Sequence, residues 1–284
     1  MGSTFQPNGS NASAQGMQAY AALSLYQPHR ARQAIRDAHE KKIPPLLGYN
    51  ATLSSVPMTQ FLAPMGYDAV WIDWEHSSCN MVHDTMFMSQ GKTVPWVRVP
   101  GHDHAAIGYA LDAGVSIVIP QVETVEQARH VVSSAKFGLR QNGTRSAPPF
   151  RLTQGLTDMP LSPARGDVWQ NMNDQAAVMI QIETLQGIEN LDKILREVPD
   201  IDCVWLGSLD CRISMGLPGK RRDGRDTLKK HDVPKAGFCF GSADAFTKTA
   251  GEMALMFISA DVLQLVQMNK KLVETRELLG AATK

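Results

Sequence analysis

A (β/α)₈ barrel is the fold that this sequence predicts, and three observations lead to it. Short apolar segments of five to eight residues recur along the chain from about residue 45 onward. Longer segments, whose apolar residues have helical spacing, fill the gaps between them. The chain has 284 residues, which suits one large α/β domain. Strands alternating with helices form parallel sheets, and eight such units close into a barrel. A doubly wound sheet is the alternative for the same pattern.

The eight predicted strands are rich in Val, Ile, Leu, Phe and Trp, which fit a buried pleated sheet. They cover residues 45–50, 68–74, 95–99, 115–122, 177–183, 203–209, 237–241 and 255–259. An extra N-terminal helix is predicted over 29–41, before the first strand. Between later strands, 124–137 and 186–198 place their apolar residues on one face at helical spacing.

The domain organisation follows from composition. Residues 1–25 are rich in Gly, Ser, Asn, Gln and Ala, and we expect a disordered or loosely docked arm. Residues 26–284 are predicted to form a single barrel domain. Residues 138–175 interrupt the rhythm with Gly, Pro, Asn and Arg, which predicts a long loop. Residues 217–234 leave room for only a short helix after the sixth strand.

Charge and hydropathy exclude several classes of protein. Lys plus Arg and Asp plus Glu both number 28, so no basic excess indicates nucleic-acid binding. No apolar run approaches the roughly 18–20 residues that span a bilayer, and the N-terminus lacks a basic-then-apolar signal. We therefore expect a cytoplasmic protein without membrane or nucleic-acid partners. Zero net charge favours self-association.

Two acidic residues end neighbouring predicted strands. Glu183 ends the strand over 177–183, and Asp210 directly follows the strand over 203–209. The carboxyl ends of parallel strands meet at the same edge of a barrel. Two carboxylates there repel each other unless a cation lies between them or one binds a proton. Oxygen ligands in small number suit Mg²⁺, with Mn²⁺ or Co²⁺ as alternatives. Two solvated carboxylates at the barrel rim are the simpler reading.

The second predicted strand carries a further acid and a histidine. Alternation places Trp71, Asp73 and Glu75 on one face of this strand. An aspartate that faces a barrel interior needs a partner, and His76 lies three residues further on. An Asp–His pair fixes the imidazole tautomer and suits a general base. The alternative is that Asp73 caps a turn and His76 is a surface residue.

The third predicted strand points an arginine inward. Val97 and Val99 face the helices, so Arg98 faces the barrel interior. An inward guanidinium needs an anion, which is either a substrate carboxylate or enolate oxygen, or an inward acid such as Glu75 in a structural ion pair.

These sites, in this order, resemble the HpcH/HpaI family of metal-dependent pyruvate aldolases. The matching motifs are Asp73-Trp-Glu-His76, Val97-Arg98-Val-Pro100, Gln181-Ile-Glu183-Thr and Gly207-Ser-Leu-Asp210, followed by Met215-Gly216. The likeness extends from about residue 45 to 278. It implies a barrel of the phosphoenolpyruvate/pyruvate type, built into a trimer of dimers whose last helix swaps between partners.

The resemblance also implies roles for individual residues. Glu183 and Asp210 would hold the metal, which would chelate pyruvate or its enolate. Arg98 would bind the keto oxygen, and Asp73 with His76 would move the proton. Backbone amides near Leu209 would cradle the carboxylate. The implied substrate-binding residues are Arg98, Trp71, Gln181, Gly207, Ser208 and Leu209.

The expected activity is therefore the cleavage of a carbon–carbon bond in a 2-oxo acid. Oxaloacetate decarboxylation and retro-aldol cleavage of a 4-hydroxy-2-oxo acid both give the same enolate, which could add to a second substrate. An acyl-CoA lyase is an alternative, with Lys220-Arg221-Arg222 as its basic groove. A non-catalytic barrel that binds 2-oxo acids is another, because Leu209 replaces the family's Ala and residues 217–234 are shortened.

Overall fold

The structure is a computed structural model that describes residues 16–21, 27–53, 55–77, 82, 85, 91–138, 142–148, 168–216 and 224–282. Eight parallel strands form a closed barrel in chain order, from β1 beside β2 round to β8 beside β1. The predicted fold is therefore confirmed. The strands are β1 (Leu46–Ala51), β2 (Ala69–Asp73), β3 (Val94–Arg98), β4 (Ser116–Ile119), β5 (Val178–Ile182), β6 (Cys203–Leu206), β7 (Lys235–Phe238) and β8 (Leu255–Ala260).

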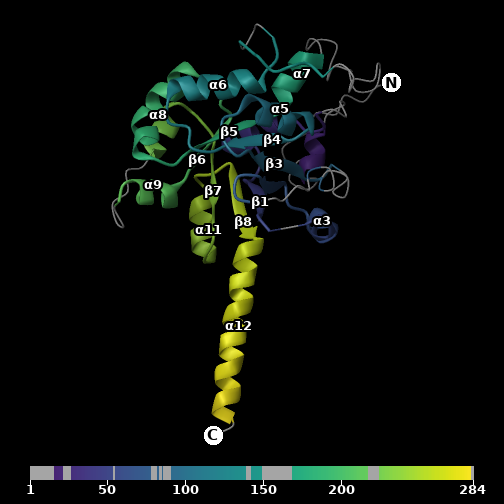
Figure 1. The fold of residues 1–284 in the computed structure, drawn as a ribbon, viewed down its shortest axis with the longest axis vertical. Coiled ribbons are helices and arrows are strands. Elements are labelled where there is room, and N and C mark those ends of the chain that lie inside the picture. Colours follow the sequence, from purple (N-terminus) through teal and green to yellow (C-terminus); the bar gives the residue numbers. More distant parts are fainter. Residues whose placement is uncertain are drawn as a thin grey trace.

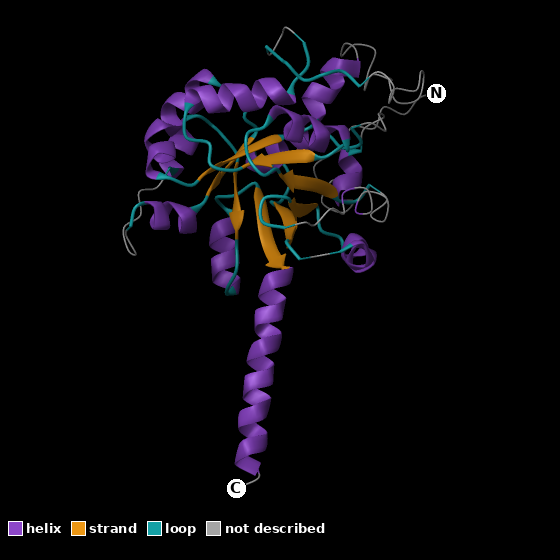
Figure 2. Cartoon of the chain, in the orientation of Figure 1, coloured by secondary structure: helices purple, strands orange, loops and turns teal. Residues whose placement is uncertain are grey.

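Helices surround this barrel, and the last one projects from it (Figures 1 and 2). They are α2 (Ala31–His39), α3 (Val56–Leu62), α5 (His104–Asp112), α6 (Val125–Ala135), α7 (Val168–Gln175), α8 (Leu185–Glu197), α9 (Ser208–Ser214), α10 (Arg225–Lys230), α11 (Ala243–Ala250) and α12 (Asp261–Ala282), with 3₁₀ helices η1 (Gly16–Tyr20) and η2 (Ala63–Met65). No helix in the described part of the chain is both long and apolar enough to cross a membrane.

Four sequence expectations need correction. The strand predicted over 203–209 ends at Leu206, because Ser208 already begins α9. The strand predicted over 237–241 lies two residues earlier, where Lys235 and Ala236 pair with β6. The last part of the predicted loop 138–175 forms α7, whereas residues 139–141 and 149–167 lie outside the described residues. Residues 16–21 of the predicted arm are docked, since Met17 and Tyr20 are buried. Short apolar stretches within polar segments gave too weak a signal for these last two elements.

Strand alternation divides the apolar residues of the barrel strands into two clusters. Val70, Ile72 and Val97 belong to the cluster between the barrel and its helices. Trp71 and Trp96 belong to the second cluster, which fills the barrel interior. This interior cluster also contains Met17, Tyr20 and Ile35, so η1 and α2 close one end of the barrel. The predicted extra N-terminal helix therefore completes the core.

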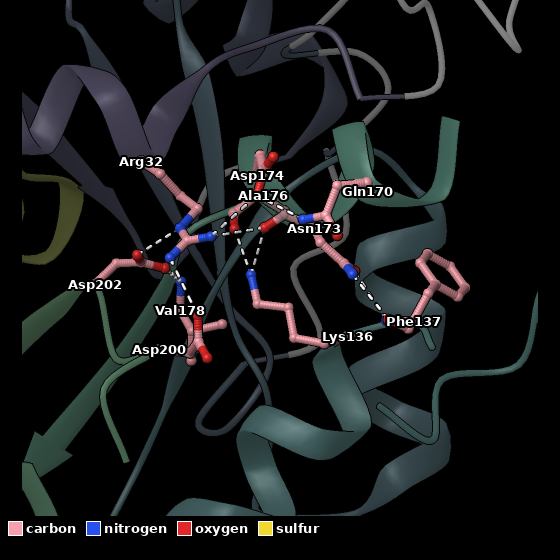
Figure 3. Close-up of polar contacts among 10 residues, drawn as sticks. All are labelled: Arg32, Lys136, Phe137, Gln170, Asn173, Asp174, Ala176, Val178, Asp200 and Asp202. Carbon is pink, nitrogen blue, oxygen red and sulfur yellow. Dashed lines mark hydrogen bonds and ion pairs between the residues drawn. The ribbon is translucent and has the colours of Figure 1, made fainter. Parts of the chain in front are cut away.

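A buried lysine ties the end of α6 to the end of α7 (Figure 3). Lys136 is fully buried, and its Nζ donates to the backbone oxygens of Asn173 at 2.6 Å and Ala176 at 3.4 Å. Carbonyls at a helix C-terminus lack intrahelical donors, so the ammonium satisfies groups that would otherwise be buried alone. Burial lowers the pKa of Lys136 to about 8, and the charge of Arg32 adds to this effect.

Arg32 extends this network from α2 to the starts of two strands (Figure 3). Its Nε donates to Asp202 Oδ1 at 2.6 Å, and its Nη1 donates to the Asn173 backbone oxygen at 3.0 Å. The second oxygen of Asp202 accepts from the Val178 N–H at 2.8 Å. The network therefore fixes α2, α7 and the beginnings of β5 and β6 relative to one another.

We expect Lys136→Met to lower the free energy of unfolding at pH 7 by about 2 kcal/mol, because the α7 carbonyls lose their donor. The folded-state pKa of about 8 lies below the ordinary value of 10.5, so the unfolded chain binds the proton more tightly. Wild-type stability should therefore rise relative to the variant between pH 8 and 10.5. Urea unfolding across this range measures the difference. The exposed Lys42→Met is the control, and an equal loss in both variants would contradict the prediction.

Candidate active site

Glu183 lies directly after β5 and is held by donors from β5 and from the turn after β4. It is only 6% exposed. Its Oε1 accepts from Gln181 Nε2 at 2.9 Å, and its Oε2 accepts from the Gln121 backbone N–H at 3.1 Å. Gly207 lies against its other side, where an added Cβ would come within 2.6 Å of Glu183 Cγ. The close approach of β6 to this carboxylate therefore requires glycine at position 207.

The pKa of Glu183 is shifted by burial and by its charged neighbours. Burial and, to a smaller extent, the negative charge of Asp210 raise its pKa from 4.5 to about 7, against the opposite effects of the Gln121 N–H and Arg98. Asp210 is exposed and belongs to the first turn of α9. The structure thus brings the two predicted metal ligands close enough to interact.

Asp73 and Arg98 face each other across the β2–β3 register. Arg98 Nε donates to Asp73 Oδ1 at 3.0 Å and Nη2 to Oδ2 at 2.5 Å, while Nη1 lies 2.9 Å from Glu75 Oε2. Burial alone would lower the pKa of Arg98, but its bonds with Asp73 and the charges of Asp73 and Glu75 raise it. The guanidinium therefore remains charged inside the barrel and is clamped in one orientation.

His76 does not form the expected side-chain pair with Asp73. The Asp73 carboxylate is bound by Arg98, and only the His76 backbone N–H reaches it, at 3.3 Å. The His76 side chain is 67% exposed, and its Nε2 lies 3.6 Å from Glu75 Oε2. A guanidinium forms two parallel bonds with a carboxylate, so Asp73 has a stronger partner on β3 than in its own loop. Strand register, which the sequence did not reveal, decides this.

A cavity of about 310 Å³ opens beside these groups. The predicted residues that line it are Trp71, Arg98, Gln181, Glu183, Gly207, Ser208, Leu209 and Asp210. Asp73 and His76 are not among its lining residues. Sequence reasoning missed Asn50, Trp205 and Phe238, which also line it. The alternation of β6 placed Trp205 on the inward face and could have indicated it.

The floor of the cavity is aromatic. Trp71 is 2% exposed, with Arg98 Cζ lying 5.4 Å from its ring centre. Its ring lies 5.0 Å from that of Trp205, which in turn lies 4.8 Å from that of Phe238. Trp71 therefore packs deep in the barrel and supports Arg98 by a cation–π contact. Leu209 is 61% exposed, so its side chain lies largely in solvent at the rim.

Three further sequence predictions concern the metal site, the basic cluster and the short sixth helix. No group of three or more His, Cys, Asp or Glu residues in the described segments could hold a metal ion. A two-carboxylate site is compatible with Mg²⁺, which usually keeps several waters and takes few protein ligands. The basic cluster Lys220-Arg221-Arg222 lies outside the described residues. The sixth barrel helix, α10, has only six residues, as the shortened segment predicts.

Comparisons with known proteins show the family of this chain. A sequence profile for the HpcH/HpaI aldolase/citrate lyase family matches residues 49–268. The hydroxypyruvate/pyruvate aldolase of Sagittula stellata is 27% identical over 231 residues, which cover 76% of this chain and 86% of that protein. The 2-keto-3-deoxy-L-rhamnonate aldolase of Salmonella gallinarum is 34% identical over 167 residues, covering 57% of this chain and 59% of that protein.

Among solved structures, macrophomate synthase is similar over nearly the whole chain. The TM-score is 0.81 at 27% identity, and the match covers 99% of this chain and 100% of that one. The Trp71-x-Asp73 pair and the stretch that begins Gly143-Thr-Arg145-Ser146 also resemble this enzyme in sequence. The structural similarity shows the overall likeness to this enzyme.

Proposed function

Because the chain belongs to the HpcH/HpaI aldolase/citrate lyase family and is therefore a carbon–carbon lyase of the aldolase type, we propose that it forms a pyruvate enolate from a 2-oxo acid. In oxaloacetate the C3–C4 bond breaks, CO₂ leaves and the electron pair remains on C3 as the enolate. In a 4-hydroxy-2-oxo acid a base takes the proton of the 4-hydroxyl group, the same bond breaks, and an aldehyde leaves instead. The observation that carries this proposal is one cavity lined by both Arg98 and the Glu183–Asp210 carboxylates.

The residues present fit a divalent cation. Glu183 is buried with a pKa raised to about 7, partly by Asp210, so a cation between the two would relieve their repulsion. Gln181 Oε1 is a buried acceptor without a hydrogen-bond partner in the structure, and Gln181 lines the same cavity. Glu183 and Asp210 would hold Mg²⁺, or alternatively Mn²⁺ or Co²⁺. When bound, the metal would polarise the keto group and stabilise negative charge on its oxygen.

Arg98 would supply the second source of positive charge. Its hydrogen bonds with Asp73 use two N–H groups, and its Nη1 forms an ion pair with Glu75. A guanidinium has more donors than these. The remaining donors would bind the keto oxygen as it gains charge, an electrostatic contribution that is often the largest in catalysis. Asp73 would then act by holding Arg98 in position.

His76 would move the proton at C3. Its imidazole is largely exposed and lies beside Glu75 rather than Asp73. A carboxylate next to an imidazole orients the ring. We therefore propose that Glu75 takes the orienting part that the sequence assigned to Asp73. The backbone around Ser208 and Leu209, at the start of α9, lines the cavity where the substrate carboxylate would bind.

The cavity has room for a second reactant. At about 30 Å³ for each water molecule, a volume of 310 Å³ equals about ten waters. The enolate of a three-carbon acid would leave part of it open toward the aromatic side chains of Trp205 and Phe238. Addition of the enolate to an acceptor could therefore follow its formation in the same cavity.

We propose that the protein is a homo-oligomer in which α12 packs against another copy. This helix has 22 residues, is about 33 Å long and projects from the barrel (Figure 1). Leu265, Met268, Leu272 and Leu279 recur on one stripe and are between 49% and 67% exposed. An isolated apolar helix is marginally stable in water, and a contiguous apolar stripe marks an interface.

Oxaloacetate decarboxylation tests the proposed reaction. We expect release of CO₂ that EDTA abolishes and Mg²⁺ restores, because the substrate oxygens need the cation held by Glu183 and Asp210. CO₂ capture and coupled detection of pyruvate measure the rate. A 4-hydroxy-2-oxo acid assayed in parallel separates decarboxylation from retro-aldol cleavage. A folded protein that cleaves neither compound with Mg²⁺, Mn²⁺ or Co²⁺ would contradict the proposal.

A further inference from the structure

The chain takes an unusual backbone conformation at Gln121, between β4 and α6. We propose that this conformation exists to aim the Gln121 N–H at the Glu183 carboxylate, so that Gln121 is a positioning residue for the metal ligand. The inference rests on the proposed function, because Glu183 is there assigned to the metal. The proposed role belongs to the backbone of Gln121, and the Gln121 side chain has none.

The local geometry of Gln121 supports this assignment. Its φ is +50°, a left-handed value that residues other than Gly, Asn and Asp rarely adopt. Its side chain is exposed and is not among the residues that line the cavity. Its N–H donates to Glu183 Oε2 at 3.1 Å. The contact with the site is therefore made by the main chain alone.

Neighbouring groups hold the strained conformation in place. The Pro120 carbonyl accepts from His102 Nε2 at 2.7 Å, and the Val122 N–H donates to the Gln181 backbone oxygen at 3.0 Å. The Glu123 N–H donates to Gln127 Oε1 at 2.7 Å. A sparsely populated conformation persists when its surroundings determine it from several sides, and such residues gather at functional sites. Here the turn is anchored both before and after Gln121.

The Gln121 N–H is the second of two donors that bind the Glu183 carboxylate, one on each oxygen. Gln181 Nε2 binds Oε1 from β5, whereas the Gln121 N–H binds Oε2 from the turn after β4. One donor on each oxygen fixes the plane of the carboxylate group, and Gly207 packs against its Cγ. If the Gln121 amide turned away, one donor would remain and the carboxylate could rotate about its last bond. The cation would then bind less tightly.

Substitutions at position 121 distinguish a backbone function from a side-chain function. Glycine adopts positive φ freely and asparagine does so more readily than most residues, whereas a β-branched valine is a genuine outlier there. A backbone function therefore predicts that affinity for metal follows the order Gly, Asn, Gln, Ala and Val, from tightest to weakest. A side-chain function predicts equal losses for Gly, Ala and Val.

The experiment measures Mn²⁺ binding to the full-length, metal-free protein by calorimetry, together with its thermal unfolding. We expect Gln121→Gly to bind Mn²⁺ at least as tightly as the wild type, and Gln121→Val to bind about tenfold more weakly. Gln121→Ala should fall between them, which keeps the test informative if the Val variant folds poorly. Lys41, with a φ of +59° at the end of α2, provides the matched control. Lys41→Gly and Lys41→Val should change thermal stability without changing Mn²⁺ affinity.

Three results of this experiment would overturn the positioning role of Gln121. Equal affinities in the Gly, wild-type and Val proteins would overturn the positioning role while leaving the metal site intact. Equal losses in the Gly, Ala and Val variants would assign the effect to the side chain and overturn it as well. Absence of Mn²⁺ binding in the wild type would instead remove the proposed metal site, and this inference with it.

Discussion

Glu183→Gln should lower the rate of enolate formation by about a thousandfold and, at the same time, stabilise the metal-free protein. Glutamine keeps the shape of the side chain, and its carbonyl oxygen can still accept from the Gln121 N–H. Its amide can donate to Gln181 Oε1, which is now buried without a partner. The variant loses the charge that binds the cation but also avoids the cost of burying that charge.

The stability gain should depend on pH in a defined direction. The folded-state pKa of Glu183 is raised from 4.5 to about 7, so the folded protein binds this proton more tightly than the unfolded chain. Wild-type stability should therefore fall relative to the variant as pH rises from 4.5 to 7, and then stay level. The full difference at pH 8 should approach about 3 kcal/mol. Urea unfolding in EDTA at pH 5 and pH 8 measures it.

Added Mg²⁺ should make the wild type more stable than the Glu183→Gln variant. The cation binds the folded wild type and not the unfolded chain, so it stabilises the wild type by mass action, whereas Glu183→Gln should not respond. Glu123→Gln is the matched control, because Glu123 has the same place in Gln121-Val-Glu123-Thr as Glu183 has in Gln181-Ile-Glu183-Thr, but it accepts from Thr184 Oγ1 instead. An unchanged rate in Glu183→Gln, or equal losses in both variants, would contradict the mechanism.

The second large effect concerns assembly. We expect the double substitution Leu265→Glu and Leu272→Glu to dissociate the oligomer, because it places two charges in the apolar stripe of α12. Burying an unpaired carboxylate costs far more than the contacts of a single leucine contribute. Light scattering coupled to size-exclusion chromatography measures the mass of each variant.

The control for the assembly experiment is a second double substitution, which changes the net charge by the same amount but on the opposite side of α12. Gln267→Glu with Lys270→Gln alters the net charge by −2, as does the leucine pair, but leaves the stripe intact. This control should elute with the mass of the wild type. A monomeric wild type, or dissociation of the control alone, would show that the apolar stripe does not hold copies together.

Local sequence signals predicted most of the barrel. Apolar runs and helical spacing located all eight strands because a barrel strand is buried on both faces and its core pattern is visible in the chain itself. The predicted boundaries of helices and strands were wrong where a polar residue ended or began an element, as at Ser208, which starts α9. The buried segment around Met17 and Tyr20 was missed because only a few apolar residues mark it within a polar arm.

What the sequence determined by itself is the set of chemical groups and the strand on which each one lies. Alternation along a strand is local, so it placed Arg98 facing inward without knowledge of its neighbours. Pairing between strands is not local. Only the tertiary structure showed that Asp73 is opposite Arg98 and that His76 lies beside Glu75. It alone revealed that the backbone of Gln121 reaches Glu183, because strand register and a turn conformation depend on the closed barrel as a whole.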